Sequence, residues 1–453
     1  MTLDLDFHLP SSRPPLGRVV SPPPESNSTA SHLLRENHTR FHVYFRNVAG
    51  HNHTAHAVLT TLALGGTPED LHRAYEEYAF LQRPLRAVDW DDVREMQRSE
   101  KAFRANMQQQ DMYPNYLALF TQEIEAQQGD WQAVVTKHCF ARTELADFMF
   151  AQLFEGLYHP FIHMGLGVEF GLAGVVAEGL AHTASHDPMR VWPFFVMAEK
   201  LAAAEKGKGK ERRPLVELYG EVRANSTLRN APRAADGPWR LRDGIIGQVL
   251  EEMAQVAAQF WVEPTEEDVE RATAEMISCA AWACGAAEGP RGQRKIDFFL
   301  MHCVTSSLVV TAMVRQPWIK IADKARLVEW KTRLDLAWYA ASAAPVLREE
   351  NVVGYEPTLS KGLDWEALYK TAREQHDDGH ITKYMRAIKN GEDATAPYER
   401  EPNAASFLPI RGESWLRLAQ FCHDTTTGPL KAENKWVFGI GYEEMWGTVP
   451  AFV

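Results

Sequence analysis

The stretch Gln375-His376-Asp377-Asp378-Gly379-His380-Ile381-Thr382-Lys383 brings two histidines and a lysine close together in the sequence. Within it His376 and His380 stand four residues apart, and Lys383 follows about one helical turn later. On a helix this spacing points side chains toward a common place. The pattern is similar to the HExxH motif of zinc proteases, but Asp377 replaces its glutamate base, and the inverted HxxEH motif fails at Gly379. A zinc protease is therefore disfavoured, and a metal site here requires histidines from elsewhere in the chain.

Three other segments supply candidate histidines. They are His51-Asn52-His53-Thr54-Ala55-His56, His159-Pro160-Phe161-Ile162-His163, and His302 within the apolar run at residues 297–310. A single buried histidine is more often structural than a metal ligand, because one hydrogen bond can satisfy its ring. Four separate segments in apolar, helix-like sequence nevertheless favour a metal centre, since imidazole is a common ligand of transition metals.

Local sequence ranks the histidines within two of these segments. His56 directly precedes an apolar stretch, so it is the first choice of ligand, with His53 second. Pro160 cannot stand inside a regular helix, because its ring clashes with the preceding turn. A helix that restarts at Pro160 makes His159 a cap residue and places His163 one turn inside, which favours His163 as the ligand.

The composition bounds the class of protein. Of the 453 residues, 48 are Lys or Arg and 60 are Asp or Glu, so the net charge is -12. This acidic balance disfavours a nucleic acid or an anionic membrane as partner and favours a protein that acts on small molecules. The five cysteines form no CxxC pair, which is typical of a reducing compartment. We therefore expect a cytoplasmic, intracellular protein.

No segment predicts secretion or membrane insertion. The first residues lack the basic start and the continuous apolar run of a signal peptide. The most apolar candidate, residues 164–181, is interrupted by Glu169 and Glu178 and is rich in glycine, so it predicts a buried helix. Glu169 is a candidate for supporting a histidine ring from behind, with a solvent-facing position as the alternative.

The chain divides by composition into a tail and a helical body. Residues 1–30 are rich in proline and serine and predict a disordered tail. Within residues 31–453 apolar residues recur at spacings of three and four, and no run of alternating strands is present, so the fold class is mostly α. We expect one large helical body, or two helical lobes divided near the basic loop at residues 206–214, around a central histidine-lined metal pocket.

Taken together, the histidine motifs resemble the questin oxidase family. The motifs are Asn52-His53-x-x-His56, His159-Pro160-x-x-His163-x-Gly165-x-Gly167-x-Glu169, Phe298-Phe299-Leu300-Met301-His302 and His376-Asp377-Asp378-Gly379-His380-x-x-Lys383. The resemblance covers most of the chain from residue 31 onward. It implies an oxygenase of fungal secondary metabolism that opens a ring of an anthraquinone-type aromatic polyketide with dioxygen. In this family the net reaction is Baeyer–Villiger-like, and NADPH is implicated as the reductant.

The sequence favours one of the possible oxygen-activating cofactors over another. A flavin-dependent Baeyer–Villiger enzyme carries a GxGxxG turn between a strand and a helix. The glycines at 165, 167 and 171 do not match this spacing and follow no β-branched strand, so no tightly bound flavin is expected. Histidine ligands suit iron, and an incompletely filled coordination sphere can bind dioxygen. Non-haem iron is therefore the expected cofactor.

The resemblance implies a specific set of site residues. The expected metal ligands are His56, His163, His302, His380 and Lys383. The expected catalytic residues are Lys383, His380 and His376. An ammonium group at Lys383 would repel a cation, so three states stay open: a side chain turned to solvent, a neutral amine, or a carbamate formed with carbon dioxide. We expect His186 to take no part in the site.

Two alternatives accompany this reading. One is an NADPH-dependent Baeyer–Villiger-type monooxygenase without iron, in which the histidines serve as acid–base and binding groups. The other is a helical binding protein whose histidines are structural. Metal content and turnover of anthraquinones separate the three hypotheses.

Overall fold

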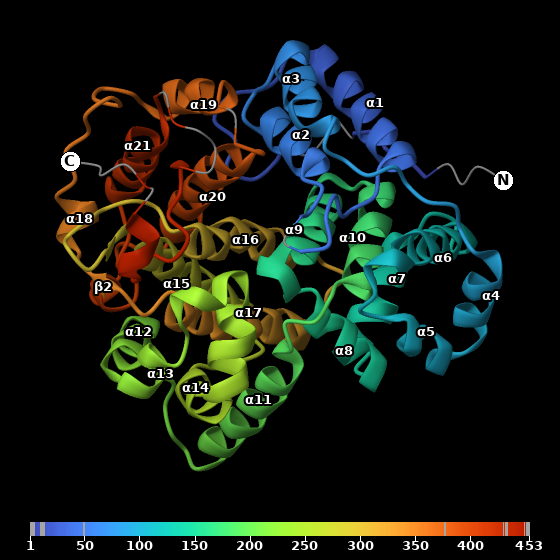
Figure 1. Ribbon diagram of the computed structural model, residues 1–453. Coiled ribbons are helices and arrows are strands. Elements are labelled where there is room, and N and C mark those ends of the chain that lie inside the picture. The colour runs from blue at the N-terminus through green and yellow to red at the C-terminus, as the bar shows by residue number, and fades with distance from the viewer. Residues whose placement is uncertain are drawn as a thin grey trace. The chain divides into compact units, whose positions relative to one another are not determined.

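The chain folds into helices almost throughout. The computed structural model describes residues 5–9, 14–48, 50–375, 377–428, 430, 434–447 and 449. Among these residues the only named strands are β1 (Ala287–Glu288) and β2 (Val346–Leu347), which pair antiparallel. The prediction of a mostly α fold is therefore confirmed (Figure 1).

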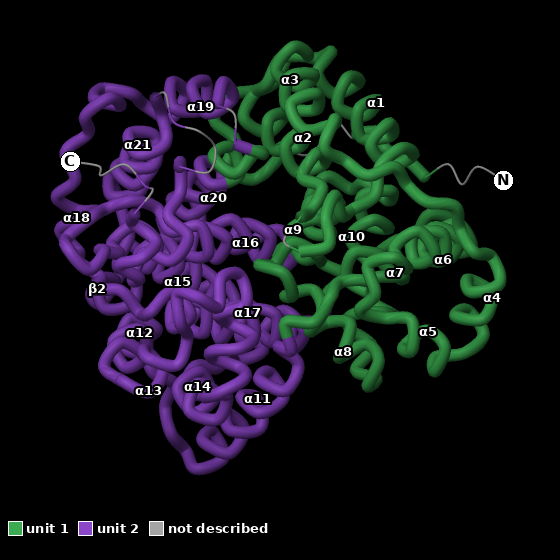
Figure 2. Tube along the Cα trace, in the orientation of Figure 1, with its two compact units in different colours: residues 1–189, 315–319, 378–383 green, residues 190–314, 320–377, 384–453 purple. Residues whose placement is uncertain are grey.

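The chain forms two compact units, shown in Figure 2. Unit 1 comprises residues 1–189, 315–319 and 378–383, and unit 2 comprises residues 190–314, 320–377 and 384–453. The basic loop near residues 206–214 was expected to divide two lobes, but it lies inside unit 2. The chain instead leaves unit 1 after Met189, at an Arg190 whose φ is 67°.

The helices of unit 1 carry several of the histidines of the chain. They are α1 (Pro24–Arg40), α2 (Thr54–Ala63), α3 (Pro68–Ala79), α4 (Trp90–Arg98), α5 (Glu100–Asn106), α6 (Tyr113–Ala126), α7 (Trp131–Val135), α8 (Glu144–Gln152), α9 (Glu155–Phe170) and α10 (Ala173–Ser185). Every side chain of α10 is buried, and this helix packs on both α9 and α6. Helix α10 is therefore the centre of the unit.

Helix α1 corrects the prediction of a disordered tail through residue 30. The helix begins at Pro24, because proline fixes φ and needs no hydrogen-bond partner at a first helical position. The hydroxyl of Ser26 donates a hydrogen bond to the carbonyl of Gly66, and Ala30 is fully buried. The helix therefore starts within the proline-rich segment that was predicted to be a disordered tail.

Helix α9 is interrupted in its first turn. Gly156, Leu157 and Tyr158 have positive φ values of 52°, 58° and 63°, and a regular helix runs from His159 onward. Such φ values cost a residue other than glycine about 1 to 2 kcal/mol, so packing must stabilise them, and Tyr158 is fully buried. The predicted break ahead of Pro160 is confirmed.

Unit 2 contains the remaining elements. They are α11 (Val191–Gly207), α12 (Leu215–Ala224), α13 (Ser226–Asn230), α14 (Leu250–Ala257), α15 (Glu266–Gly285), α16 (Phe298–Val314), α17 (Ile321–Ala341), α18 (Glu350–Val353), α19 (Trp365–Arg373), α20 (His380–Thr395), α21 (Ser414–Thr426) and the two strands. Helices α15, α16 and α17 pack on one another. The first turn of α20 belongs to unit 1.

The apolar helices of the described chain are core helices. None of them is both long and apolar enough to cross a membrane. The candidate at residues 164–181 is split between α9 and α10 at Gly171, whose φ of 70° ends the first helix.

Candidate metal centre

Five buried histidines meet inside unit 1. They come from α2 (His53 at its N-cap and His56), from α9 (His159 and His163) and from the first residue of α20 (His380). We call these five residues the main histidine cluster. Neighbouring rings are close, since the centroids of His53 and His56 are 5.3 Å apart and those of His53 and His380 are 4.9 Å apart.

His56 and His163 face each other within this cluster. Nε2 of His56 lies 3.2 Å from Nδ1 of His163. The other ring nitrogen of His163, Nε2, lies 2.7 Å from Oε2 of Glu178, whose Oε1 lies 2.7 Å from Nδ1 of His38. Burial favours a raised pKa at Glu178, but its hydrogen bonds with His163 and His38 lower that pKa to about 2. An ionised carboxylate only accepts protons, so Nε2 of His163 donates to Glu178, and in the neutral form of the ring the Nδ1 lone pair faces His56.

His53, His159 and His380 form the other half of the cluster. One ring nitrogen of each lies within 4.8 Å of the others, and the Nε2 atoms of His53 and His159 are 2.7 Å apart. Nδ1 of His159 donates to the carbonyl of Gly156 at 2.5 Å, and Oδ2 of Asp378 lies 2.5 Å from Nδ1 of His53. Because a carbonyl oxygen only accepts protons, Nδ1 of His159 holds a ring proton, and in the neutral form of that ring the Nε2 lone pair faces His53.

Burial favours the neutral, metal-binding form of two rings of the cluster. Burial, followed by the positive charge of Lys383, lowers the pKa of His53 and of His56 well below the usual value. Both rings are then neutral at pH 7, which is the state that binds metal. Lys383 is itself buried, with 5% of its surface exposed. The sequence-based option of a side chain turned to solvent is therefore wrong for Lys383.

These residues fit a transition-metal ion. Among the described residues, Nδ1 of His56 is buried without a hydrogen-bond partner. Two lone pairs at the observed separations repel each other unless a proton or a cation lies between them. Nitrogen ligands of one metal at about 2.0 to 2.1 Å are roughly 3 Å from each other, which is close to the spacing of His56 and His163. Imidazole with a nearby carboxylate, here Asp378, suits iron.

The structure gathers most of the residues that the sequence singled out. His56, His163, His380 and Lys383 all belong to unit 1. His302 belongs to unit 2, where it is buried on α16 and its Nδ1 donates to the carbonyl of Phe298 at 2.7 Å. His376 lies outside the described residues. The ligand roles of all these residues stay predictions.

Sequence reasoning missed several residues of the region. It offered Glu169 as a candidate for supporting a histidine, whereas Glu178 contacts His163, and Oε1 of Glu169 accepts the backbone N–H of Leu16. It also overlooked His182, although His182 and His186 have the same four-residue spacing as His376 and His380. That spacing was the signal that could have found them.

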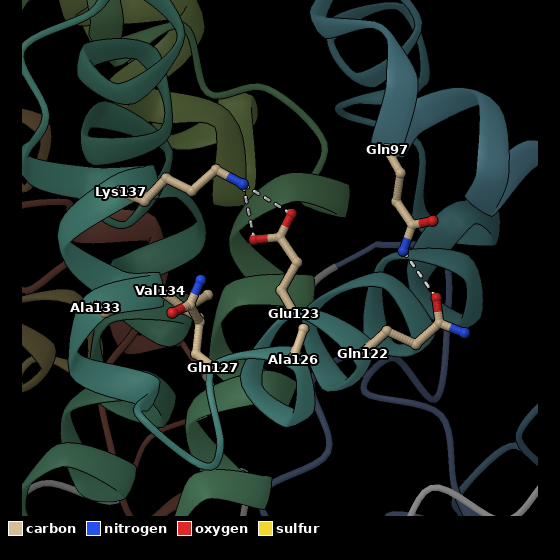
Figure 3. A pocket seen from close by; sticks show the side chains of 8 residues that line it. All are labelled: Gln97, Gln122, Glu123, Ala126, Gln127, Ala133, Val134 and Lys137. Carbon is tan, nitrogen blue, oxygen red and sulfur yellow. Dashed lines mark hydrogen bonds and ion pairs between the residues drawn. The ribbon is translucent and has the colours of Figure 1, made fainter.

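A surface pocket of unit 1 lacks such chemistry (Figure 3). Its lining comes from Gln97, Gln122, Glu123, Ala126, Gln127, Ala133, Val134 and Lys137. Four of its polar side chains already bond one another, since Nζ of Lys137 lies 3.0 Å from each carboxylate oxygen of Glu123 and Gln97 donates to Gln122 at 2.7 Å. None of these eight lining residues is a histidine or a cysteine, so we assign no redox role to this pocket.

The chain is similar to known fungal enzymes. The sequence model of the questin oxidase-like family matches residues 50–388. A Baeyer-Villiger oxidase from Pestalotiopsis fici is 46% identical over 436 residues, with 96% of each chain covered. A questin oxidase from Aspergillus fumigatus is 46% identical over 445 residues, with 97% of this chain and 98% of the relative covered. A Baeyer-Villiger monooxygenase from a Cryptosporiopsis species is 42% identical over 432 residues, with 95% of each chain covered.

Proposed function

The chain belongs to the questin oxidase-like family and is an oxidoreductase, and from this premise we propose that it opens a ring of an anthraquinone-type aromatic polyketide. The substrate class follows from the name of the questin oxidases, and the reaction type follows from the Baeyer-Villiger names of other relatives. The co-substrate is dioxygen and the pathway is fungal secondary metabolism. We also place the enzyme in the cytoplasm, because its five cysteines are buried and free.

We propose non-haem iron as the cofactor. The observation that carries this proposal is the 3.2 Å approach of His56 Nε2 to His163 Nδ1, with Glu178 holding the far nitrogen of His163. A carboxylate behind a histidine orients the ring and strengthens it as a ligand. His56, His163 and His380 would hold the ion. Bound iron supplies the activation of dioxygen.

The charges around the cluster support a proposal for the role of Lys383. Its charge is the largest electrostatic influence of a neighbouring residue on both His53 and His56, so a protonated amine would oppose a cation at the cluster. We propose that Lys383 is a metal-side group in a neutral or carbamylated state. A carbamate would add an anionic oxygen to the set, while Asp378 is already held at His53.

Metal analysis of anaerobically purified protein tests the proposal. We expect iron to co-purify, and we expect turnover of an anthraquinone panel to stop after chelation and to return when ferrous iron is restored. Labelled dioxygen should place oxygen atoms in the opened product. An iron-free protein with full activity in the presence of chelator would refute the iron centre.

The names of the relatives favour one alternative, an NADPH-dependent Baeyer–Villiger-type monooxygenase without iron. In that reaction one oxygen atom enters the ring, the other becomes water, and NADPH supplies two electrons. Stoichiometric NADPH oxidation that is insensitive to chelators would support it. Incorporation of both atoms of dioxygen without NADPH would support the dioxygenase instead.

A further inference from the structure

A second group of histidines lies beside the main histidine cluster. His51 precedes α2, His182 lies in the last turn of α10 and His186 directly follows that helix. All three are buried, with 8%, 1% and 4% of their surfaces exposed. One ring nitrogen of each lies within 4.8 Å of the others. The i, i+4 spacing of His182 and His186 places both rings on one side of the helix end.

The proton of His186 is fixed by a backbone carbonyl. Nδ1 of His186 lies 2.7 Å from the carbonyl oxygen of Asp187, which can only accept a hydrogen bond. In the neutral ring the lone pair is therefore on Nε2, which lies 2.9 Å from Nε2 of His51. Burial lowers the pKa of His186 and keeps its ring neutral. A histidine held in this way is prepared to bind a metal through its Nε2 lone pair.

His182 is the least satisfied residue of the group. Within the part of the chain that the structure describes, neither of its ring nitrogens has a hydrogen-bond partner, although the ring is almost fully buried. Leaving buried polar atoms unpaired costs about 1 to 3 kcal/mol. A bound ion would remove this cost at one of the two nitrogens, because it accepts that nitrogen's lone pair.

The stacking of His51 separates this group from the main histidine cluster. The rings of His51 and His159 are nearly parallel, with centroids 4.0 Å apart. Nε2 of His159 faces His53, whereas Nε2 of His51 faces His186. The two stacked rings therefore direct their Nε2 atoms to different partners.

We propose that His51, His182 and His186 form a second metal site, which binds zinc. Three imidazoles without a thiolate match the ligand sets of zinc sites that keep one further position for water. The ion would connect the segment before α2 to the end of α10. Tyr44 supports that helix end, because its hydroxyl lies 3.2 Å from both the carbonyl of His182 and the hydroxyl of Ser185.

Counting metal equivalents tests this site independently of activity. Apo-protein of full length is titrated with Co²⁺ and followed by visible absorption, with elemental analysis after gel filtration. We expect two equivalents for the wild type, one for His182→Asn and one for His163→Asn. A matched control is His138→Asn, a buried histidine of unit 1 bonded to Glu123 outside both groups, which should keep two.

Each result has a defined meaning. If the wild type and His182→Asn bind the same number of ions, the second site does not exist and a water or a proton satisfies the three rings. If His182→Asn does not fold by circular dichroism, His186→Asn is used for the same count. If the wild type binds one ion that is lost in His182→Asn and kept in His163→Asn, the second site stands and the proposed iron centre fails.

Discussion

Oε2 of Glu178 lies 2.7 Å from Nε2 of His163, while the opposite nitrogen of that ring faces His56. The carboxylate on α10 thus sets both the orientation and the tautomer of a histidine on α9. Helices α9 and α10 pack on each other at the centre of unit 1, and this packing holds Glu178 next to His163.

Glu178→Gln should weaken iron binding by about 10- to 100-fold, because the amide keeps the shape but removes the charge behind His163. Competition against a chelator of known affinity measures the effect. Glu169→Gln is the matched control, since Glu169 bonds the backbone of Leu16. Equal affinity of Glu178→Gln and the wild type would contradict the role of the carboxylate.

Lys383→Ala should reduce turnover by roughly 10- to 100-fold if Lys383 is a metal-side group. Steady-state turnover of an anthraquinone measures this, and a carbamate should give bicarbonate-dependent activity and a labelled carbon signal with ¹³C-bicarbonate. Lys389→Ala, in the same helix and paired with Asp393, should behave as the wild type. A fully active Lys383→Ala enzyme would show that the residue has no part in the reaction.

His380→Ala and His302→Ala should both lose iron and turnover, because the sequence places both residues in the ligand set. Elemental analysis after anaerobic purification checks the metal, and circular dichroism checks the fold. His138→Ala serves as the control for removal of a buried histidine. Iron retained at the wild-type level in His302→Ala would restrict the ligands to residues of unit 1.

Gly156→Ala should destabilise the protein by more than about 2 kcal/mol, because φ is +52° and the added methyl group would meet Nε2 of His186 at 2.1 Å. Urea denaturation measures the change. Gly129→Ala is the matched control, since it has φ of +90° with open space around the new methyl group and should cost only about 1 to 2 kcal/mol. Equal effects at the two positions would mean that the histidine does not fill this space.

Asp424→Asn should lower the stability of the protein by about 1 to 3 kcal/mol at pH 7. The NH2 group of the asparagine is itself a donor, so it cannot accept the hydrogen bonds that the carboxylate oxygen accepts. The carboxylate accepts hydrogen bonds from the hydroxyl of Tyr355 at 2.6 Å and from the N–H groups of Thr358 and Ser360 at 2.7 and 2.6 Å. Burial opposes ionisation, but these bonds and His423 outweigh it and lower the pKa of Asp424 below its usual range.

The sign of the pH dependence follows from that lowered pKa. The stabilisation by the carboxylate is complete above the unfolded pKa of about 3.9 and is lost as the pH falls through the lower folded pKa. The gap in urea midpoint between the wild type and Asp424→Asn should therefore be constant from pH 7 to pH 5 and narrow below pH 4. A gap that widens toward acid would contradict the assignment.

Much of this architecture could be predicted from the sequence. Spacings of three and four residues gave the helices, and Pro160 located the break in α9. The extent of the helix at Pro24 could not be predicted, because a proline-rich composition hides a helix start that depends on tertiary contacts such as Ser26 with Gly66.

The sequence located the segments that carry the histidines of the site, but it did not predict the contacts between the rings. Which nitrogen faces which depends on backbone detail, such as the carbonyl of Gly156 that fixes the proton of His159. Glu169 lies on α9 and Glu178 lies on α10, and the turn at Gly171 that separates the two helices determines which carboxylate reaches His163. Such choices depend on three-dimensional packing and have no signal in the spacing of residues.

The order of the segments in unit 1 has a consequence for synthesis. The ribosome releases residues 1–189 early, whereas residues 378–383, which carry His380 and Lys383, emerge only after nearly all of unit 2. A nascent chain therefore presents four of the five clustered histidines long before the fifth and the lysine. The complete ligand set exists only once translation is almost finished, so loading of the proposed iron becomes a late, post-synthetic step that truncated chains cannot complete.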